Sequence, residues 1–390
     1  MRTDLDRRAM AALSSGHLAV DFASGAVPAL LPFLAERFDL SYTATAAIML
    51  AATVSSSLVQ PLFGLLSDRR GAMWLLPAGI FLAGSGTALA GLSPSYALVL
   101  LAVFLAGLGI AAYHPEGAKF ASYASGRRRA SGMALFNIGG NTGYALGPIV
   151  VTPVVIWLGL SGALVAALPV FVGGVLVLFA LPYLRTLRPD GRVRGVAAGP
   201  DRPRAMAVLI GVILVRSLTW FGLITFVPLW VVSLGHSKAD GNRLLSLMLV
   251  AGVLGALVVG PIADRVGLRR TLLGTTALLP PLVLVFVYVG GVAGAAALML
   301  VGVCVVGAFG VVMVLSQLYL PQHVAMASGL NVGLAVGLGG LSAVALGAVA
   351  DAVDLETALT VCAVAPVFGV GLCLLLPAPR ERVAAEPVSA

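Results

Sequence analysis

The stretch Gly64-Leu65-Leu66-Ser67-Asp68-Arg69-Arg70-Gly71 decides how this 390-residue sequence folds. It sets one acid and two bases between glycines, and long apolar segments lie on both sides. The pattern returns as Gly260-Pro261-Ile262-Ala263-Asp264-Arg265-Val266-Gly267, in which Asp264 follows Asp68 by 264 − 68 = 196 residues. A pattern repeated at half the chain length indicates two copies of one structural unit. We therefore expect a duplicated architecture built around two charged turns.

The composition indicates a chain that lies in lipid. It is 59% hydrophobic and 10% charged, with a mean hydropathy of +1.04, whereas soluble domains carry about 25% charged residues. The net charge of +8 could indicate a nucleic-acid partner, but the bases gather in short turns, so we expect none. Cys304, Cys362 and Cys373 lie in apolar runs, which makes a disulfide framework unexpected. The first apolar stretch holds His17 and Asp21, which favours an uncleaved helix over a signal peptide.

The length of the apolar segments predicts the fold. A helix needs about 20 apolar residues to cross a bilayer. Division at polar turns gives twelve such segments, namely 12–35, 43–66, 72–91, 95–119, 130–152, 161–183, 206–233, 242–263, 270–290, 293–319, 326–350 and 356–376. We predict an all-α integral membrane protein with twelve transmembrane helices in two pseudo-symmetric six-helix bundles. These are residues 1–184 and 206–390, joined by an Arg-, Pro- and Gly-rich linker at 185–205.

The basic residues predict the orientation. They fill the N-terminus, the even-numbered turns, the linker and the C-terminal tail, whereas the opposite side carries Arg37, Lys238 and Arg243. We therefore expect a multi-pass protein of the inner (cytoplasmic) membrane with both termini in the cytoplasm. A parallel repeat of this kind also predicts a binding site near mid-membrane and transport by rocking of the halves.

These motifs resemble those of major facilitator superfamily transporters. The two charged turns match the superfamily's loop 2–3 motif and its weaker copy in loop 8–9. A narrower resemblance is to the fosmidomycin-resistance branch, and its motifs are His17-Leu18-x-x-Asp21, Gln60-Pro61, His114-Pro115-Glu116, Gly139-Gly140-Asn141-x-Gly143-x-x-x-Gly147-Pro148, Ser328-Gly329-Leu330 and Gly339-Gly340-Leu341. The resemblance implies the major facilitator fold and proton-driven drug efflux, although the antiporter-type motif lacks its final Gly-Gly. It also implies a gating role for Gly64, Asp68, Arg69, Gly71, Gly260, Asp264, Arg265 and Gly267.

Ionisable side chains inside spanning helices are costly and mark functional sites. Asp21 lies about 20 Å along the first helix, near mid-bilayer, and His17 is four residues earlier on the same face. We expect Asp21 to load and release the driving proton with His17 as partner. The alternative is a hydrogen bond that only pins the helix. His114 and Glu116, in the fourth helix, are expected to join this proton path or to meet substrate, unless Glu116 merely pairs with Lys119.

Arg216 is the leading candidate for substrate binding. Its depth in the seventh helix is close to that of Asp21 in the first. Three interpretations of Arg216 stay open. It could form an ion pair with Asp21, it could bind an anionic phosphonate, phosphate or carboxylate through two hydrogen bonds, or it could lie at the membrane interface. A polar stripe on the fifth helix and scattered residues of the second half complete the predicted substrate site, namely Asn137, Asn141, Tyr144, Trp220, Gln317 and Asn331.

The main prediction is a proton-coupled efflux antiporter for small drugs or metabolites, fosmidomycin-like phosphonates included, which works by alternating access. A proton-coupled importer or exchanger of small organic anions is the runner-up. An enzyme is not expected: His17-x-x-x-Asp21 has the spacing of some acyltransferase motifs, but the pair lies inside an apolar helix, and the sequence has no phosphate loop or metal cluster. We expect no cofactor, and as partners a small-molecule substrate, protons and the lipid bilayer, with the chain as a monomer.

Overall fold

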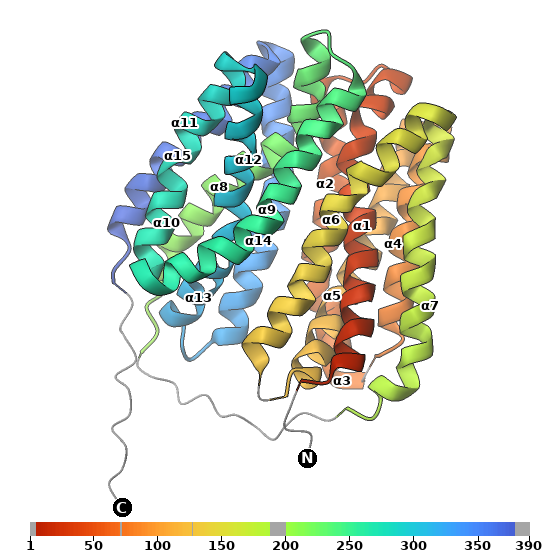
Figure 1. Ribbon diagram of the computed structural model, residues 1–390, viewed down its shortest axis with the longest axis vertical. Helices are drawn as coiled ribbons and strands as arrows, with labels where there is room; N and C mark the ends of the chain where they lie inside the picture. Colours follow the sequence, from red (N-terminus) through yellow and green to blue (C-terminus); the bar gives the residue numbers. More distant parts are fainter. Residues whose placement is uncertain (1–4, 71, 127, 188–199, 379–390) are drawn as a thin grey trace, which may run out of the picture.

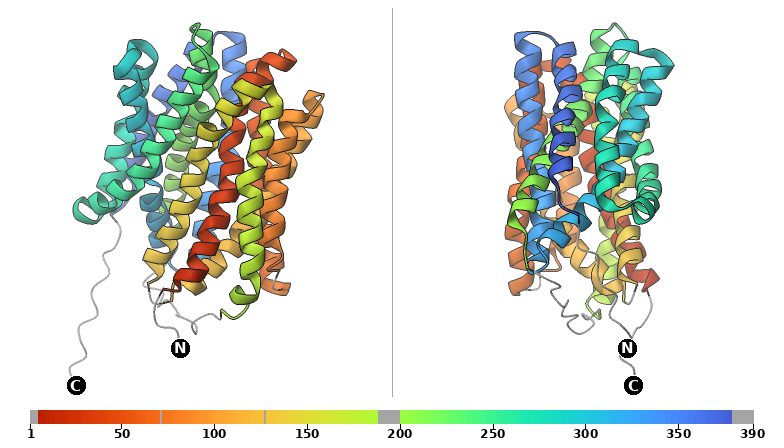
Figure 2. Two further views of the ribbon diagram at one scale, coloured as in Figure 1. Left: turned by 45° about the vertical axis from the view of Figure 1, so that its right-hand side comes forward. Right: turned by 90° about the vertical axis from the view of Figure 1, so that its left-hand side faces the viewer.

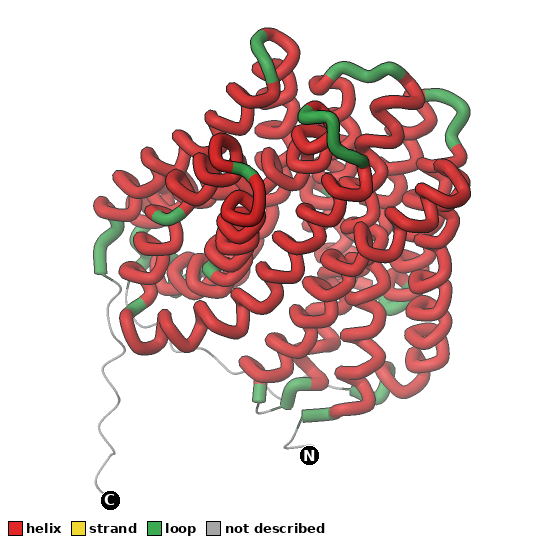
Figure 3. Tube along the Cα trace, turned by 45° about the horizontal axis from the view of Figure 1, so that its top comes forward, coloured by secondary structure: helices red, strands yellow, loops and turns green. Residues whose placement is uncertain are grey.

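The computed structural model describes residues 5–70, 72–126, 128–187 and 200–378, and these ranges fold into helices without a strand (Figures 1 and 3). The first half contains α1 (Arg7–Phe38), α2 (Tyr42–Leu58), α3 (Gln60–Arg70), α4 (Leu75–Leu92), α5 (Tyr96–Ala124), α6 (Arg129–Leu158), the 3₁₀ helix η1 (Gly159–Ala166) and α7 (Ala167–Leu184). The second half contains α8 (Pro203–Ser233), α9 (Lys238–Val266), α10 (Leu268–Ala277), α11 (Leu279–Leu284), the π-helix η2 (Val285–Val289), α12 (Gly291–Gly307), α13 (Phe309–Tyr319), α14 (Val324–Ala352) and α15 (Leu355–Leu375).

The helices account for twelve membrane crossings. Eleven helical stretches of the described chain are long and apolar enough to span a bilayer. One of them, Ser131–Leu184, has 54 residues, which is more than twice the length that a single crossing needs. It turns back at η1, so that α6 and α7 each provide one crossing. The predicted all-α, twelve-helix membrane fold is confirmed, and the chain is a multi-pass membrane protein.

Short polar turns end and restart the helices, as the sequence predicts. Side chains cap several helix starts by accepting a hydrogen bond from a backbone N–H: Asp6 does so for α1, Ser41 for α2, Ser237 for α9 and Asp354 for α15. Such caps satisfy backbone N–H groups that have no partner within the helix. Because the caps satisfy the helix ends directly, the loops between the spans are short.

The two charged stretches are mostly helical, which differs from the turns we predicted. Residues 64–70 form the end of α3, while Gly71 lies outside the described residues. In the second copy, residues 260–266 end α9, and the reversal occurs at Gly267. Its φ of 97° is a left-handed conformation that glycine adopts without steric cost. The Leu, Ile and Ala residues of the motif favour helix, so one glycine is enough to turn the chain.

The cores show where the two halves meet. One hydrophobic cluster contains residues of both halves, such as Leu30 of α1 and Trp230 of α8. Two further clusters each belong to one half: the first surrounds Met10 and Leu184, and the second surrounds Met206. These separate clusters lie at the end of the molecule where α1 and α8 begin (bottom of Figure 1; Figure 2). We call this the entry end. The halves therefore share a core at the opposite, far end and have separate cores at the entry end.

Polar contacts reinforce the seal at the far end. The Asp351 carboxylate of α14 accepts hydrogen bonds from the backbone N–H groups of Tyr42 (2.8 Å) and Thr43 (2.9 Å) at the start of α2. A carboxylate is also favoured there by the helix dipole. The buried amide of Asn242 in α9 donates to the Ala29 carbonyl and to the Thr152 hydroxyl, both at 2.9 Å. Lys238 pairs with Glu36 across the same boundary. These contacts hold the halves together only where they already share a core.

We predict that Asp351→Ala loosens the far end. The substitution removes two hydrogen bonds between the halves, and each hydrogen bond to a charged group contributes about 1.5–3 kcal/mol. Hydrogen–deuterium exchange at the start of α2 should rise by about tenfold or more. Asp354→Ala is the matched control, because Asp354 caps α15 within its own half. Equal exchange at α2 in the two variants would contradict the proposed seal.

Candidate functional site

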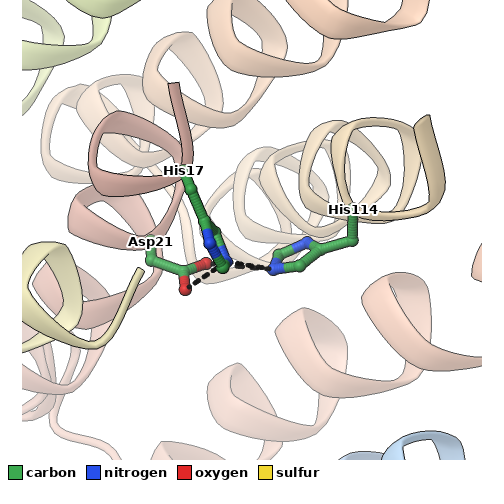
Figure 4. A group of neighbouring side chains, drawn as sticks. All are labelled: His17, Asp21 and His114. Carbon is green, nitrogen blue, oxygen red and sulfur yellow. Dashed lines mark hydrogen bonds and ion pairs between the residues drawn. The ribbon is translucent and has the colours of Figure 1, made fainter. Parts of the chain in front are cut away.

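Two histidines and one aspartate meet in the first half of the molecule (Figure 4). His17 and Asp21 come from one face of α1, and His114 comes from α5. His17 Nε2 lies 3.2 Å from Asp21 Oδ2 and 3.2 Å from His114 Nε2, and His114 Nε2 lies 3.3 Å from Asp21 Oδ1. The three functional groups thus contact one another pairwise. We call them the His–Asp–His cluster.

The backbone fixes how the two imidazole rings point. His17 Nδ1 is 2.8 Å from the carbonyl oxygen of Phe136 in α6, and His114 Nδ1 is 2.8 Å from that of Ile110. A carbonyl oxygen only accepts hydrogen bonds, so each Nδ1 must carry the proton. In the neutral ring the other nitrogen is then an acceptor. Both Nε2 atoms therefore direct lone pairs into the cluster.

This arrangement requires a cation. An ionised carboxylate has no proton to donate, so Asp21 and the two neutral rings would present only acceptors to one another. Acceptors at 3.2–3.3 Å attract one another only when a proton or a metal ion lies between them. With one added proton the cluster has no net charge, which lowers the cost of burying it. The three groups are thus arranged so that they could hold a proton or a metal ion.

Helix α6 forms a close wall behind the cluster. The His17 ring stacks on Phe136 with 4.1 Å between ring centroids. A methyl group on Gly140 would lie 2.6 Å from Asp21 Oδ2 and would also clash with His17. Only glycine fits at this position, since real side chains do not approach so closely. The wall leaves the cluster partly accessible: the Asp21 and His114 side chains are 18% and 25% exposed, and that of His17 is 7% exposed.

Glu116 does not join the cluster. Its side chain is fully buried between α5 and α3, where Oε2 accepts a hydrogen bond from Ser67 and lies 3.7 Å from Lys119 Nζ. The Lys119 ammonium also donates to the Ser67 hydroxyl and carbonyl, at 2.9 and 3.2 Å. Glu116 Oε1 has no hydrogen-bond partner among the described residues. Glu116 and Lys119 therefore tie α5 to the end of α3, beside the repeated charged motif.

Arg216 is buried inside the second half, at 5% exposure. Its guanidinium donates to the Thr276 hydroxyl of α10 at 2.8 Å and to the Cys304 carbonyl of α12 at 2.7 Å. Asp21 instead pairs with the two histidines, so the ion pair between the halves is not formed in this structure. No carboxylate of the described residues lies within ion-pairing distance of Arg216.

The remaining predicted residues are spread over several helices. Asn137 is exposed on α6; Asn141 and Tyr144 of α6, Trp220 of α8 and Gln317 of α13 are half-buried; and Asn331 of α14 is buried, with its amide 3.8 Å from the Met313 sulfur. Of the charged motifs, Arg69, Asp264, Arg265 and Gly267 are exposed, Gly64 and Gly260 are half-buried, and the Asp68 side chain lies outside the described residues. These predicted substrate residues come from four helices, α6, α8, α13 and α14.

Sequence reasoning missed several residues of the site. Phe136 and Thr276 position the charged groups, yet each has a residue type common in any apolar helix. Gly140 lies in the glycine-rich motif of the fifth spanning helix, α6, and the structure adds that it packs against His17 and Asp21. Asn242 was also missed. As an amide inside an apolar helix it carried a usable signal, since such groups seek partners on neighbouring helices.

Comparisons with known proteins agree with the fold. The family model of the Major Facilitator Superfamily matches residues 13–344. The chain is 31% identical over 375 residues to the uncharacterized MFS-type transporter YfnC of Bacillus subtilis, covering 94% of this chain and 91% of the relative. It is 30% identical over 383 residues to the fosmidomycin resistance protein of Escherichia coli, covering 96% and 93%. The crystal structure of the nucleoside transporter NupG superposes with a TM-score of 0.78 at 13% identity, covering 94% and 99%.

A twelve-span, all-helical membrane protein in two bundles, with ionisable side chains buried in its helices, has the architecture of a secondary transporter. The chain belongs to the Major Facilitator Superfamily.

We predict that Gly140→Ala displaces the cluster. The added methyl group overlaps Asp21 and His17, and overpacking of this kind typically costs about 1–3 kcal/mol. Substrate transport should fall sharply, with a modest loss of thermal stability. Gly371→Ala is the matched control, because a methyl group at Gly371 of α15 meets no atom within 4 Å. Full transport by Gly140→Ala would show that the cluster tolerates displacement.

Proposed function

We propose that this transporter exports small organic anions, phosphonate drugs among them, in exchange for protons. The similarity to a fosmidomycin resistance protein over nearly the whole chain supports the substrate class and the direction. The observation that supports protons as the driving ion is the His–Asp–His cluster, in which three hydrogen-bond acceptor groups lie 3.2–3.3 Å apart.

The charge of the cluster suits it to carry protons. Asp21 with two neutral rings has a charge of −1, one bound proton makes the cluster neutral, and a second makes it positive. Charges are costly in a spanning segment, so the neutral, protonated cluster favours the step in which the protein moves without substrate. The proton is bound from the far side and released at the entry end, and the deprotonated protein then makes the opposite step with substrate bound.

Helix α5 provides a path from the proton to the gate. His114 belongs to the cluster, so its position on α5 depends on whether the cluster holds a proton. Glu116, two residues further along α5, contacts Ser67 at the end of α3. Helix α3 carries the first charged motif, for which the sequence predicts a gating role. A shift of α5 when the proton leaves would therefore reach this motif through one hydrogen bond. We assign Asp68, Arg69, Asp264 and Arg265 to closure of the entry end.

The buried charge of Arg216 supports an anionic substrate. A permanently charged guanidinium, without a carboxylate partner among the described residues, is held inside the second half by a hydroxyl and carbonyl oxygens. An anionic group of the substrate would supply the missing negative charge, by exchange with the Thr276 or Cys304 contact. Asn137, Asn141, Tyr144, Trp220, Gln317 and Asn331 are proposed to line the path as the bundles move.

The proposed location is the inner membrane, with both termini in the cytoplasm. The positive-inside rule supports it, because most bases of the chain fall on the side of the termini. The entry end, where the halves have separate cores, is then the cytoplasmic end, from which a drug is exported. The transporter is proposed to act as a monomer.

Replacement of the proton carrier tests the coupling. With Asp21→Asn, substrate uptake into inside-out vesicles should fall to the level measured without a proton gradient. Exchange of labelled for unlabelled substrate should persist, because it needs no net proton movement. Asp201→Asn is the control: Asp201 also pairs with a histidine, His323, but in an exposed loop. Gradient-driven uptake that survives in Asp21→Asn would rule out Asp21 as carrier.

Direction is tested in cells. Expression of an exporter lowers the intracellular concentration of a phosphonate drug, and a protonophore abolishes the effect. A rise in intracellular drug would instead identify an importer.

The anion site is tested at Arg216. Arg216→Lys keeps the charge but loses the two-pronged geometry, and a hydrogen bond to a charged group contributes about 1.5–3 kcal/mol, or about ten- to hundredfold in affinity. The KM for a phosphonate should rise by that factor, and the KM for an uncharged substrate should not. Arg243→Lys, at the exposed start of α9, is the control. An unchanged phosphonate KM would argue against direct contact.

A further inference from the structure

We propose that the His–Asp–His cluster also binds one divalent transition-metal ion of the chemical type of Zn²⁺ or Co²⁺. His17, Asp21 and His114 form a group of metal-ligating side chains whose ligand atoms all lie within 4.8 Å of one another. The inference rests on geometry and ligand chemistry, and it does not depend on which ion drives transport.

The distances within the cluster match those of a tetrahedral metal site. Zinc binds imidazole nitrogen and carboxylate oxygen at about 2.0–2.2 Å, and two ligand atoms of such a tetrahedron are about 3.3–3.5 Å apart. The two imidazole nitrogens are 3.2 Å apart, and each has an Asp21 oxygen nearby, Oδ2 at 3.2 Å from His17 and Oδ1 at 3.3 Å from His114. A metal ion bound by both nitrogens would therefore need one Asp21 oxygen to turn toward it.

Both rings are already oriented as metal-bound imidazoles are. A ligating histidine almost always donates its second N–H to a carbonyl or carboxylate, which leaves the other nitrogen free for the metal. His17 does so to the Phe136 carbonyl and His114 to the Ile110 carbonyl, both at 2.8 Å. The Phe136 ring stacked on His17, with Gly140 behind it, prevents the ring from turning away. The ligands are thus positioned before the ion arrives.

The ligand set selects the type of metal. Two imidazoles and one carboxylate suit zinc, cobalt and nickel, whereas magnesium and calcium prefer oxygen ligands throughout. Three protein ligands leave a fourth position for water. The exposed fractions of Asp21 and His114, 18% and 25%, provide the route by which a hydrated ion reaches the site.

The test uses full-length, tag-free protein in detergent, titrated with Co²⁺ in the absence of substrate and of any gradient. We expect one equivalent of Co²⁺ to give the visible absorption bands of a tetrahedral nitrogen- and oxygen-ligated ion, and Zn²⁺ to displace it. X-ray absorption of the wild-type Zn²⁺ form should show two imidazoles and a carboxylate. No saturable binding, or a first shell without two imidazoles, would overturn the proposal.

Matched variants locate the site. The chain has four histidines, so His114→Ala should abolish the Co²⁺ bands and His236→Ala, in the exposed turn before α9, should retain them. Binding that persists in a folded His114→Ala protein would place the metal elsewhere and refute the assignment. Because the titration uses no gradient and vesicle transport is assayed with a chelator present, metal binding and proton coupling can fail separately.

Discussion

The convergence of three acceptor groups at the junction of α1, α5 and α6 is the constraint on which the site depends. Two backbone carbonyls hold both imidazole protons on the outer side of the rings, and the inner side then faces a carboxylate. Nothing in this arrangement is satisfied without a small cation. Because the cluster lies in an apolar bundle, the number of protons in it sets the charge that the bundle carries.

Close helix packing makes this cluster possible. Helix α6 approaches α1 through glycines, and at Gly140 even one methyl group would overlap the cluster. The absence of side chains at these positions lets the backbone of α6 reach His17 and accept a hydrogen bond from it. The same half has its own core at the entry end, so the cluster lies entirely within one half. At the far end the shared core and the Asp351 contact hold the two halves together.

The sequence predicts the fold well because a bilayer constrains segment length. Runs of apolar residues long enough to cross it appear as helices, and their polar turns appear as caps. The pair His17 and Asp21 was also predictable, since a spacing of four puts both on one helix face. By contrast, His114 and Glu116 are two residues apart, about 200° around a helix. Only one of them can face α1, and the local sequence does not encode how α5 is rotated.

The limits of prediction are similar for Arg216. Its depth in the helix suggested a charged partner across the halves, but its contacts are a threonine of α10 and a carbonyl of α12. Every residue has a backbone carbonyl, so the sequence does not indicate which of them accepts a hydrogen bond from Arg216. Gly140 belongs to the glycine-rich motif Gly139-Gly140-Asn141, which favours close approach of a neighbouring helix, but the motif does not show that Gly140 packs against His17 and Asp21. The sequence therefore leaves undetermined which side chains meet where the helices pack.

Nitrogen-15 NMR of histidine-labelled protein tests the central claim most directly, because the chain has four histidines and the signals of His236 and His323 can be assigned by substitution. In metal-free protein the account predicts that His17 and His114 both keep the proton on Nδ1 and that one further proton is shared among their Nε2 atoms and Asp21. A neutral ring with its proton on Nε2, or two rings without any shared proton, would contradict it.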